Sequence, residues 1–256
     1  MQFFPSRQVA FEILGLSVHW YGLLYLAAFL LSYVLVFRLQ HLRSLSLSKD
    51  DISVLLSWAV IGVIVGGRMG YVLFYEFGYF SNHLLEVLYV WNGGMSSHGG
   101  FIGVAIALGY GLKKRAVPLL PFLDVITVPI AFGLACGRLG NFINWELYGT
   151  VTDVGWAMAI PGVEGLRHPT FFYSFAKDIL IAAVCFRHLR LAAARPGTTF
   201  TIFLILYGVL RFAVEHYREQ PYGWFDIGIM SLSRGQLLTV PLIAVGVISF
   251  LMVGRR

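Results

Sequence analysis

Long apolar stretches separated by short polar segments dominate the sequence. The seven clearest run over Trp20–Phe37, Ile52–Tyr75, Gly99–Leu112, Leu119–Gly140, Phe171–Phe186, Thr198–Val214 and Leu237–Val253. Most approach the roughly 20 residues with which a helix crosses the hydrocarbon core of a bilayer. They predict an all-α, polytopic integral membrane protein with seven transmembrane helices. No internal repeat or low-complexity linker interrupts the pattern, so residues 1–256 are interpreted as a single membrane-embedded domain.

Composition agrees with this interpretation and excludes a soluble domain. Hydrophobic residues make up 58% of the chain and charged residues only 12%, whereas soluble domains contain about 25% charged residues. The net charge of +6 does not indicate a nucleic-acid partner, because the basic residues stand in short clusters between apolar stretches, where orientation signals occur. Cys136 and Cys185 lie in apolar segments without a CxxC pair, so they are interpreted as packing residues.

The distribution of Lys and Arg predicts the orientation of the chain. One side of the seven stretches has eleven basic residues, namely Arg38, Arg43, Lys49, Lys113, Lys114, Arg115, Arg187, Arg190, Arg195, Arg255 and Arg256. The other side has four, namely Arg7, Arg167, Arg218 and Arg234. Because cytoplasmic loops are enriched in basic residues, we expect the amino terminus outside and the carboxyl terminus in the cytoplasm. An odd number of crossings requires the same arrangement.

Ionisable residues within the apolar stretches are expensive in a membrane and indicate either pairing or function. Those that remain after the loop count stand toward the outward ends of their stretches: Arg68, His98, Arg138, Glu146, Lys177, Arg211 and Glu215. The polar chemistry is therefore expected near the outer leaflet, and the inner half is expected to be almost featureless. Asp124, in the inner half of the fourth stretch, is interpreted as structural.

The run from Gly137 to Gly149 is one candidate site. Arg138 and Asn141 are three residues apart, so they share one face of a helix. Asn144 and Glu146 follow, and polar residues with three glycines in so apolar a setting typically line a cavity. The alternative interpretation is a polar helix cap with an Arg–Glu pair.

A second candidate site lies on the sixth stretch. Tyr207, Arg211, Glu215 and Arg218 follow one another at spacings that place them on one helical stripe. Glu215 can pair with either arginine and leave one guanidinium for an anionic ligand. Arginine suits a phosphate because its planar fork donates two parallel hydrogen bonds. The alternative is an internal Arg–Glu–Arg network with a structural role.

Two further polar residues allow two readings each. His98 follows Ser96–Ser97 and precedes Gly99–Gly100, and it is either a satisfied interfacial residue or a catalytic one. The glycines could admit an anion to the backbone amides, but no strand precedes them, so the pattern is not a dinucleotide loop. Arg68 is either a residue of the substrate pathway or a headgroup anchor that snorkels to the interface.

These motifs resemble those of the prolipoprotein diacylglyceryl transferase family. The segment Gly137–Gly149 resembles the family signature, and the resemblance extends in order over nearly the whole chain through His19–Gly22, Gly66–Tyr75, Gly93–Ser96, His98–Gly100, Arg167–Pro169 and Tyr207–Arg218. The family has the topology expected above. The resemblance implies a multi-pass enzyme of the bacterial cytoplasmic membrane, with its active site toward the outer leaflet, that carries out the first step of lipoprotein maturation. Its partners would be phosphatidylglycerol, a preprolipoprotein signal peptide with a lipobox cysteine, and the bilayer.

The resemblance also implies the reaction and the roles of individual residues. The lipobox thiol attacks the glyceryl carbon of the lipid, which forms a thioether and releases glycerol phosphate. Arg138 would bind the lipid phosphate, Arg211 would be a second essential cation, and His98 would be the base. Substrate binding is assigned to Arg138 and to Tyr21, Asn141, Asn144, Glu146, Gly149, Tyr207, Glu215 and Arg68. Neither a metal nor another cofactor is expected.

The sequence departs from the family pattern in two places, and two other functions are weaker alternatives. The external segment between Gly149 and His168 is short, and Arg234 stands where relatives often have an apolar residue. A secondary transporter for an organic anion would place polar residues near the midplane, often in inverted repeats. An intramembrane protease would need a pair such as Ser97 and His98, but adjacent residues on a helix point apart.

Overall fold

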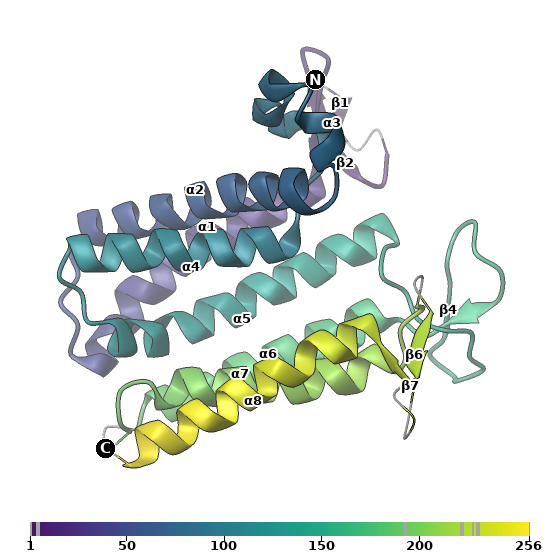
Figure 1. The fold of residues 1–256 in the computed structure, drawn as a ribbon. Helices are drawn as coiled ribbons and strands as arrows, with labels where there is room; N and C mark the ends of the chain where they lie inside the picture. The colour runs from purple at the N-terminus through teal and green to yellow at the C-terminus, as the bar shows by residue number, and fades with distance from the viewer. Residues whose placement is uncertain are drawn as a thin grey trace. The chain divides into compact units, whose positions relative to one another are not determined.

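A computed structural model describes residues 2–3, 6–191, 194–220, 223–226, 228 and 231–255 (Figure 1). The chain forms two compact units. The larger unit comprises Met1–Arg43 and Leu123–Arg256, and the smaller unit comprises Ser44–Phe122. Arg256, counted above among the basic residues, lies outside the described residues.

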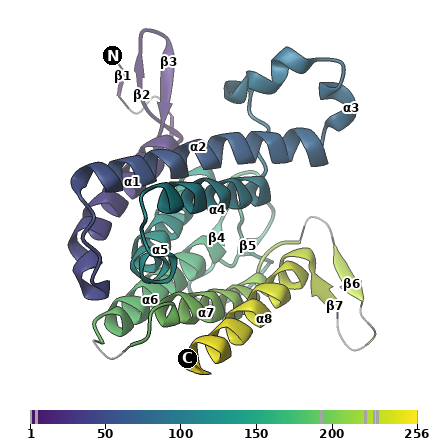
Figure 2. The same ribbon diagram turned by 60° about the vertical axis from the view of Figure 1, so that its left-hand side comes forward.

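Two long helices dominate the smaller unit. They are α2 (Lys49–Phe74) and α4 (Ser97–Lys114), and between them come α3 (Phe77–Phe80) and the short 3-10 helices η2 (Leu84–Leu88) and η3 (Val90–Asn92). Ser48 begins α2 with a capping box, in which its Oγ accepts a hydrogen bond from Asp51 N at 3.0 Å and its N donates to the Asp51 carboxylate at 2.9 Å. Figure 2 shows α2 and α4 side by side.

Glycines allow α2 and α4 to approach backbone to backbone. A Cβ atom placed on Gly66 would lie 2.4 Å from the carbonyl oxygen of Gly99, and one on Gly103 would lie 2.1 Å from that of Gly62. Packing through small residues is the usual way in which helices associate in a membrane, where hydrophobic burial gives no advantage. The spacing between α2 and α4 therefore depends on these glycines.

The larger unit contains a short sheet and most of the remaining helices. Strands β1 (Gln2–Phe3), β2 (Val9–Ile13) and β3 (Leu16–His19) form an antiparallel sheet in that order. Leu14 and Gly15 connect β2 to β3 with φ values of 52° and 81°, and two positive φ values are typical of a type I′ hairpin turn. The remaining strands form two antiparallel pairs, β4 (Met158–Ala159) with β5 (Leu166–Arg167) and β6 (Trp224–Asp226) with β7 (Ser231–Ser233).

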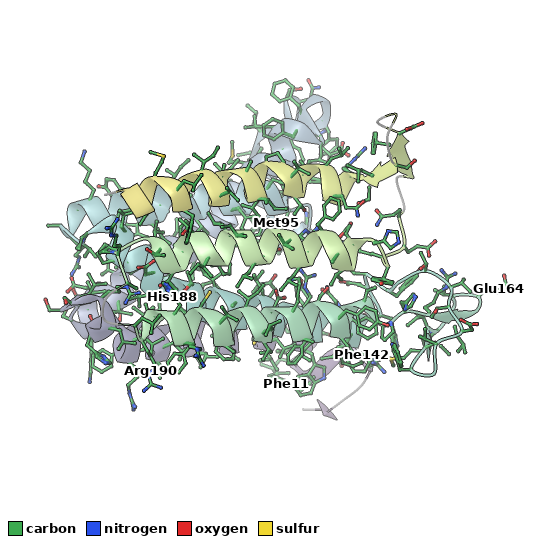
Figure 3. The ribbon with its side chains drawn as sticks, turned by 90° about the horizontal axis from the view of Figure 1, so that it is seen from below. Phe11, Met95, Phe142, Glu164, His188 and Arg190 are labelled. Carbon is green, nitrogen blue, oxygen red and sulfur yellow. The ribbon has the colours of Figure 1, made fainter. Side chains whose placement is uncertain are left out.

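The helices of the larger unit run largely alongside one another. They are α1 (Trp20–Leu39) with the 3-10 turn η1 (Gln40–Arg43), α5 (Leu119–Asn144), α6 (Thr170–Leu189), α7 (Thr198–Glu215) and α8 (Arg234–Arg255). The first residues of α5 belong to the smaller unit. Helices α6, α7 and α8 lie side by side in both views (Figures 1 and 2). Figure 3 shows Phe142 and Glu164 toward one end of this group and His188 and Arg190 toward the other.

A buried ion pair fastens the end of the larger unit that was expected to face the cytoplasm. The Asp124 carboxylate is fully buried and accepts hydrogen bonds from Arg43 Nε, Gly197 N and Phe200 N, each at 2.9 Å. Arg43 also donates to the carbonyl oxygen of Leu189 at 2.7 Å. The sequence predicted an almost featureless inner half, and this prediction is wrong for this end of the larger unit. Arg43 was counted as a loop charge but is a buried structural residue.

Each of the seven apolar stretches coincides with a helix, which confirms a mostly helical chain of membrane character. Within the described residues, five helical segments are long and apolar enough to cross a membrane: Trp20–Arg43, Lys49–Phe74, Leu119–Asn144, Thr198–Glu215 and Arg234–Val253. Helices α4 and α6 are not among them. Both contain charged residues, and α4 also contains several glycines.

We expect Gly103→Ala to destabilise the smaller unit by about 1–3 kcal/mol, because the new methyl group would overlap the backbone of α2. Gly109→Ala in the same helix is the matched control. Nothing lies within 4 Å of a Cβ atom at Gly109, so there alanine adds only its higher helix propensity. Thermal unfolding of both variants in detergent tests the expectation. Equal melting temperatures would show that the two helices are not held by this contact.

Candidate active site

A pocket in the larger unit concentrates positive charge. It is lined by residues from α5, α6, α7 and the adjoining segments, namely Arg138, Asn141, Leu147, Thr170, Phe171, Ser174, Lys177, Arg211, Val214, Glu215 and Arg218. Four of these side chains are cationic and one is a carboxylate. Such a lining favours an anionic ligand, and arginine favours phosphate or carboxylate in particular.

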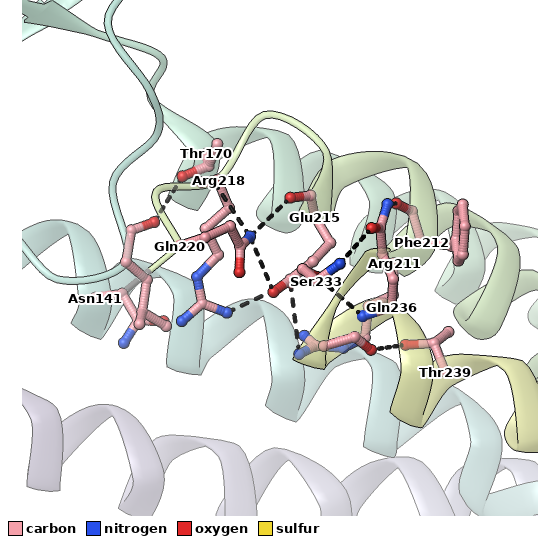
Figure 4. A network of polar contacts seen from close by, with 12 residues as sticks. Asn141, Thr170, Arg211, Phe212, Glu215, Arg218, Gln220, Ser233, Gln236 and Thr239 are labelled. Atoms are coloured by element: carbon pink, nitrogen blue, oxygen red, sulfur yellow. Dashed lines mark hydrogen bonds and ion pairs between the residues drawn. The ribbon is translucent and has the colours of Figure 1, made fainter. Parts of the chain in front are cut away.

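Glu215 lies at the centre of the arginine group on α7. Its Oε2 atom is 3.6 Å from Arg211 Nη2 and 3.5 Å from Arg218 Nη1, and Figure 4 shows the carboxylate between the two guanidinium groups. The helical spacing predicted that Glu215 would leave one arginine unpaired, whereas the carboxylate contacts both. One carboxylate shared by two arginines still leaves an excess of positive charge.

The electrostatics of Arg218 follow from its position just after α7. Burial lowers the pKa of its guanidinium, and the nearby Glu215 carboxylate acts in the opposite direction. The side chain stays charged near neutral pH, because the ordinary pKa of arginine lies above about 12. Arg218 therefore contributes a permanent positive charge to the pocket.

The start of α8 holds Glu215 in place. Gly235 lies so close that a Cβ atom there would be 2.3 Å from Glu215 Oε1. A capping box positions this glycine, since Gln236 N donates to Ser233 Oγ at 3.0 Å and Ser233 N donates to Gln236 Oε1 at 2.9 Å. Arg234, whose role the sequence left open, places its guanidinium carbon 5.9 Å from the centre of the Phe225 ring.

A chain of polar contacts links Arg138 to the end of α5. Arg138 Nη1 donates to Asn141 Oδ1 at 3.3 Å, and Asn141 Nδ2 donates to Glu146 Oε2 at 3.2 Å. Asn144 Nδ2 donates to the other carboxylate oxygen of Glu146 at 2.9 Å. The candidate residues of this segment are therefore brought together, and asparagine stands between Arg138 and Glu146 instead of a direct ion pair.

Arg7 stabilises the end of α5, a role that the sequence analysis did not find. Its Nε donates to the carbonyl oxygen of Ile143 at 2.9 Å and its Nη2 to that of Phe142 at 3.1 Å. The guanidinium carbon also lies 3.9 Å from the centre of the Trp145 ring. Cations near the last carbonyls of a helix interact favourably with its dipole. Nothing in the local sequence around Arg7 indicates a partner so far along the chain.

Tyr21 packs against a glycine, and Gly149 lies where a larger residue would not fit. The Tyr21 ring fills the space beside Gly140, where a Cβ atom would be 2.3 Å from the ring. At Gly149 a Cβ atom would lie 2.5 Å from His168 Cβ and 2.6 Å from the carbonyl oxygen of Tyr217. Gly149 thus lies where three segments of the larger unit meet, and its N donates to the His168 carbonyl oxygen at 2.8 Å.

Helix α6 contributes a buried ion pair next to Arg138. Asp178 is fully buried; it contacts Lys177 as an ion pair, and its Oδ2 lies 3.6 Å from Arg138 Nε. Lys177 Nζ lies 4.4 Å from the centre of the Tyr207 ring, a cation–π contact. Lys177 was predicted from its charge within an apolar stretch, whereas Asp178 was not predicted. The signal that could have found Asp178 is its position directly after Lys177 in the same apolar stretch.

The other two candidates lie in the smaller unit. Arg68 is buried and donates to the carbonyl oxygens of Glu86 and Gly93 at 2.6 Å and of Val87 at 2.8 Å. These bonds connect α2 to the segment before α4, so Arg68 has a structural role. The assignment of Arg68 to substrate binding stays a prediction. His98 is exposed in the first turn of α4, which Ser96 caps by accepting a hydrogen bond from Gly99 N at 3.2 Å. The role of His98 stays a prediction as well.

Comparison with known proteins identifies relatives along almost the whole chain. A family model described as prolipoprotein diacylglyceryl transferase matches residues 8–252. A phosphatidylglycerol–prolipoprotein diacylglyceryl transferase of Methylibium petroleiphilum is 44% identical over 97% of this chain and 96% of its own. Enzymes of the same name from Geobacter sulfurreducens and Nitrosomonas europaea are 39% and 42% identical and cover 100% and 93% of this chain, with 98% and 87% of their own lengths matched. The resemblance seen in the sequence is confirmed, and the transporter and protease alternatives gain no support.

We expect Gly149→Ala to lower the melting temperature by about 4–10 °C, because the methyl group would meet fixed backbone atoms of two neighbouring segments. Gly155→Ala is the matched control, since nothing lies within 4 Å of a Cβ atom at that glycine. Thermal unfolding and limited proteolysis of both purified variants make the comparison. If Gly149→Ala unfolds and resists protease like the control, the three segments do not meet at this residue as described.

Proposed function

The chain belongs to the prolipoprotein diacylglyceryl transferase family, and on that premise we propose that it transfers the diacylglyceryl group of phosphatidylglycerol to the lipobox cysteine of a preprolipoprotein. The thiol sulfur forms a thioether bond with the glyceryl carbon, the bond from that carbon to the phosphate oxygen breaks, and glycerol phosphate leaves with the bonding electrons. The observation that carries the proposal is the pocket in which four cationic side chains face one lining carboxylate.

The charge of the pocket suits the charge that develops in this reaction. A phosphodiester carries one negative charge, and the departing phosphate monoester approaches two. Groups that bind the second state more tightly than the first lower the barrier. We assign the phosphate to Arg138 and Arg211. Glu215 would orient Arg211 and Arg218, because its carboxylate lies within ion-pair distance of both.

The acceptor thiol also needs activation. A free cysteine has a pKa of about 8.5, so a base or a positive field is needed to form the thiolate near neutral pH. We propose His98 as the base, on the grounds of the family resemblance and its exposure at the start of α4. By the same resemblance, substrate positioning is assigned to Tyr21, Asn141, Asn144, Glu146, Gly149 and Tyr207.

The proposal includes seven spans, with the amino terminus outside and the active site toward the outer leaflet of a bacterial cytoplasmic membrane. Three observations support it. A helix occupies each of the seven apolar stretches. Without the buried Arg43, ten basic residues of the sequence fall on one side of these stretches against four on the other, and the pocket residues lie toward the less basic ends of α5 and α7. We propose that both compact units belong to one transferase domain, because the family match runs through both.

We expect Arg138→Ala to reduce transfer of labelled diacylglyceryl from phosphatidylglycerol to a lipobox peptide by about 10²–10³-fold, as when one charge-stabilising donor is lost. Arg138→Lys should retain part of the rate, because it keeps the charge and loses the fork. Mass spectrometry of the thioether product, together with assay of released glycerol phosphate, measures the step. Arg187→Ala, an exposed arginine at the opposite end of α6, is the control. A folded wild-type protein without transfer would sink the proposal.

The orientation has its own test, which needs no activity. In variants carrying Glu164→Cys, a membrane-impermeant maleimide should label intact cells or spheroplasts with an accessible outer face. Lys114→Cys should be labelled only after permeabilisation. The native Cys136 and Cys185 lie within α5 and α6, so the unmodified protein serves as the background control. The reverse pattern would place the amino terminus inside.

A further inference from the structure

We propose that Lys177 is a further cation of the phosphate site, and that it supplies charge needed by the departing glycerol phosphate rather than by the bound lipid. Asp178 is the positioning residue that holds the ammonium group there. This inference rests on the proposed function, which it deepens by assigning a role to a buried ion pair on α6. Neither residue belongs to the motifs that carry the family resemblance.

The placement of Lys177 argues against a merely solvated or lipid-facing side chain. A lysine in a membrane-spanning helix ordinarily extends its ammonium group to the interface, because charge in hydrocarbon is costly. Here the side chain is only 5% exposed and lines the same pocket as Arg138 and Arg211. The Asp178 carboxylate and the Tyr207 ring flank the ammonium group.

Asp178 connects Lys177 to Arg138. One carboxylate oxygen contacts Lys177, and the other lies 3.6 Å from Arg138 Nε. That oxygen and that nitrogen are both buried, and neither has a hydrogen-bond partner in the part of the chain that the structure describes. Buried polar atoms without partners call for an explanation. Because the contact between Arg138 and Asp178 is 3.6 Å long, the guanidinium can shift toward a ligand in the pocket without breaking a hydrogen bond to Asp178.

The charges of the group give Lys177 a specific task. Arg138, Lys177, Arg211 and Arg218 are positive, and Glu215 and Asp178 are negative, so the six side chains have an excess of two positive charges. That excess matches the two charges of glycerol phosphate. Without Lys177 the excess is one, which matches only the phosphodiester of the substrate. Lys177 therefore stabilises the transition state, in which the carbon–oxygen bond is breaking, more than it stabilises the bound lipid.

An interaction made mainly in the transition state affects kcat more than KM. We expect Lys177→Met to lower kcat by about 10–100-fold while KM for phosphatidylglycerol in mixed micelles stays within about twofold. Lys177→Arg, which keeps the charge, should recover most of the rate. The affinity for glycerol 1-phosphate, measured as product inhibition at pH 7, should fall by about tenfold in Lys177→Met and stay near the wild-type value in Lys177→Arg.

The double variant Lys177→Met/Asp178→Asn separates the charge from the fold. Lys177→Met alone leaves Asp178 as a buried carboxylate with less compensation, which can distort the site. The double variant removes both charges of the pair and keeps the excess at two positive charges, so a structural role, or a role through net charge alone, predicts that kcat returns. A direct role of the Lys177 ammonium group at the phosphate predicts a folded protein in which kcat stays low, because neither methionine nor asparagine places a cation there, and the affinity for glycerol 1-phosphate stays weak.

The outcomes distinguish this inference from the function on which it rests. Wild-type transfer with kcat restored in the double variant overturns the role of Lys177 and leaves the transferase assignment intact. Wild-type transfer with an unchanged kcat in Lys177→Met does the same. A folded wild-type protein that transfers nothing overturns the proposed function and the role of Lys177 with it. Low kcat in both methionine variants, with recovery in Lys177→Arg, supports the inference.

Discussion

Buried carboxylates that each hold two cations are the constraint on which the candidate site depends. A charge within a membrane-spanning helix is tolerated only when it is paired or opens onto a polar cavity. Glu215 contacts Arg211 and Arg218, and Asp178 contacts Lys177 and Arg138. Because each carboxylate is shared, the group is partly neutralised yet keeps an excess of positive charge. The same contacts therefore let α5, α6 and α7 pack together and leave a pocket that attracts an anion.

The opposite end of the larger unit applies the same rule with a different result. Asp124 accepts three hydrogen bonds at 2.9 Å, and its partner Arg43 directs its remaining donors to backbone and hydroxyl oxygens. Nothing there is left for a ligand. At the pocket the contacts of the three arginines with Asp178 and Glu215 are 3.5–3.6 Å long, and two buried atoms lack hydrogen bonds within the described residues. The complete pairing at Asp124 joins segments of the chain, whereas the incomplete pairing at the pocket agrees with the proposed anion site.

The sequence predicted the helices well and the pairings poorly, for a physical reason. Apolar length locates helices because burial in lipid acts on each segment separately. Helical spacing also brought together Arg138 with Asn141 and Arg211 with Glu215. Contacts between distant segments depend on how the helices pack, which spacing does not encode. The cap that Arg7 places on α5, the Arg43–Asp124 pair and the four carbonyl contacts of Arg68 were therefore missed.

Helix α6 shows how mean composition can conceal an apolar exposed face. It does not count among the five apolar segments, and Lys177 and Asp178 are part of the reason. Both charges are buried within the larger unit, however, while Leu180 and Val184 are 53% and 36% exposed. A bilayer contacts only the exposed face of a helix, so the apolarity of that face matters more than the mean apolarity of the whole helix. Two of the charges that lower the apolarity of α6, Lys177 and Asp178, line or support the pocket, which agrees with the proposed site. The exposed apolar residues of α6 agree with the proposed seven-span topology.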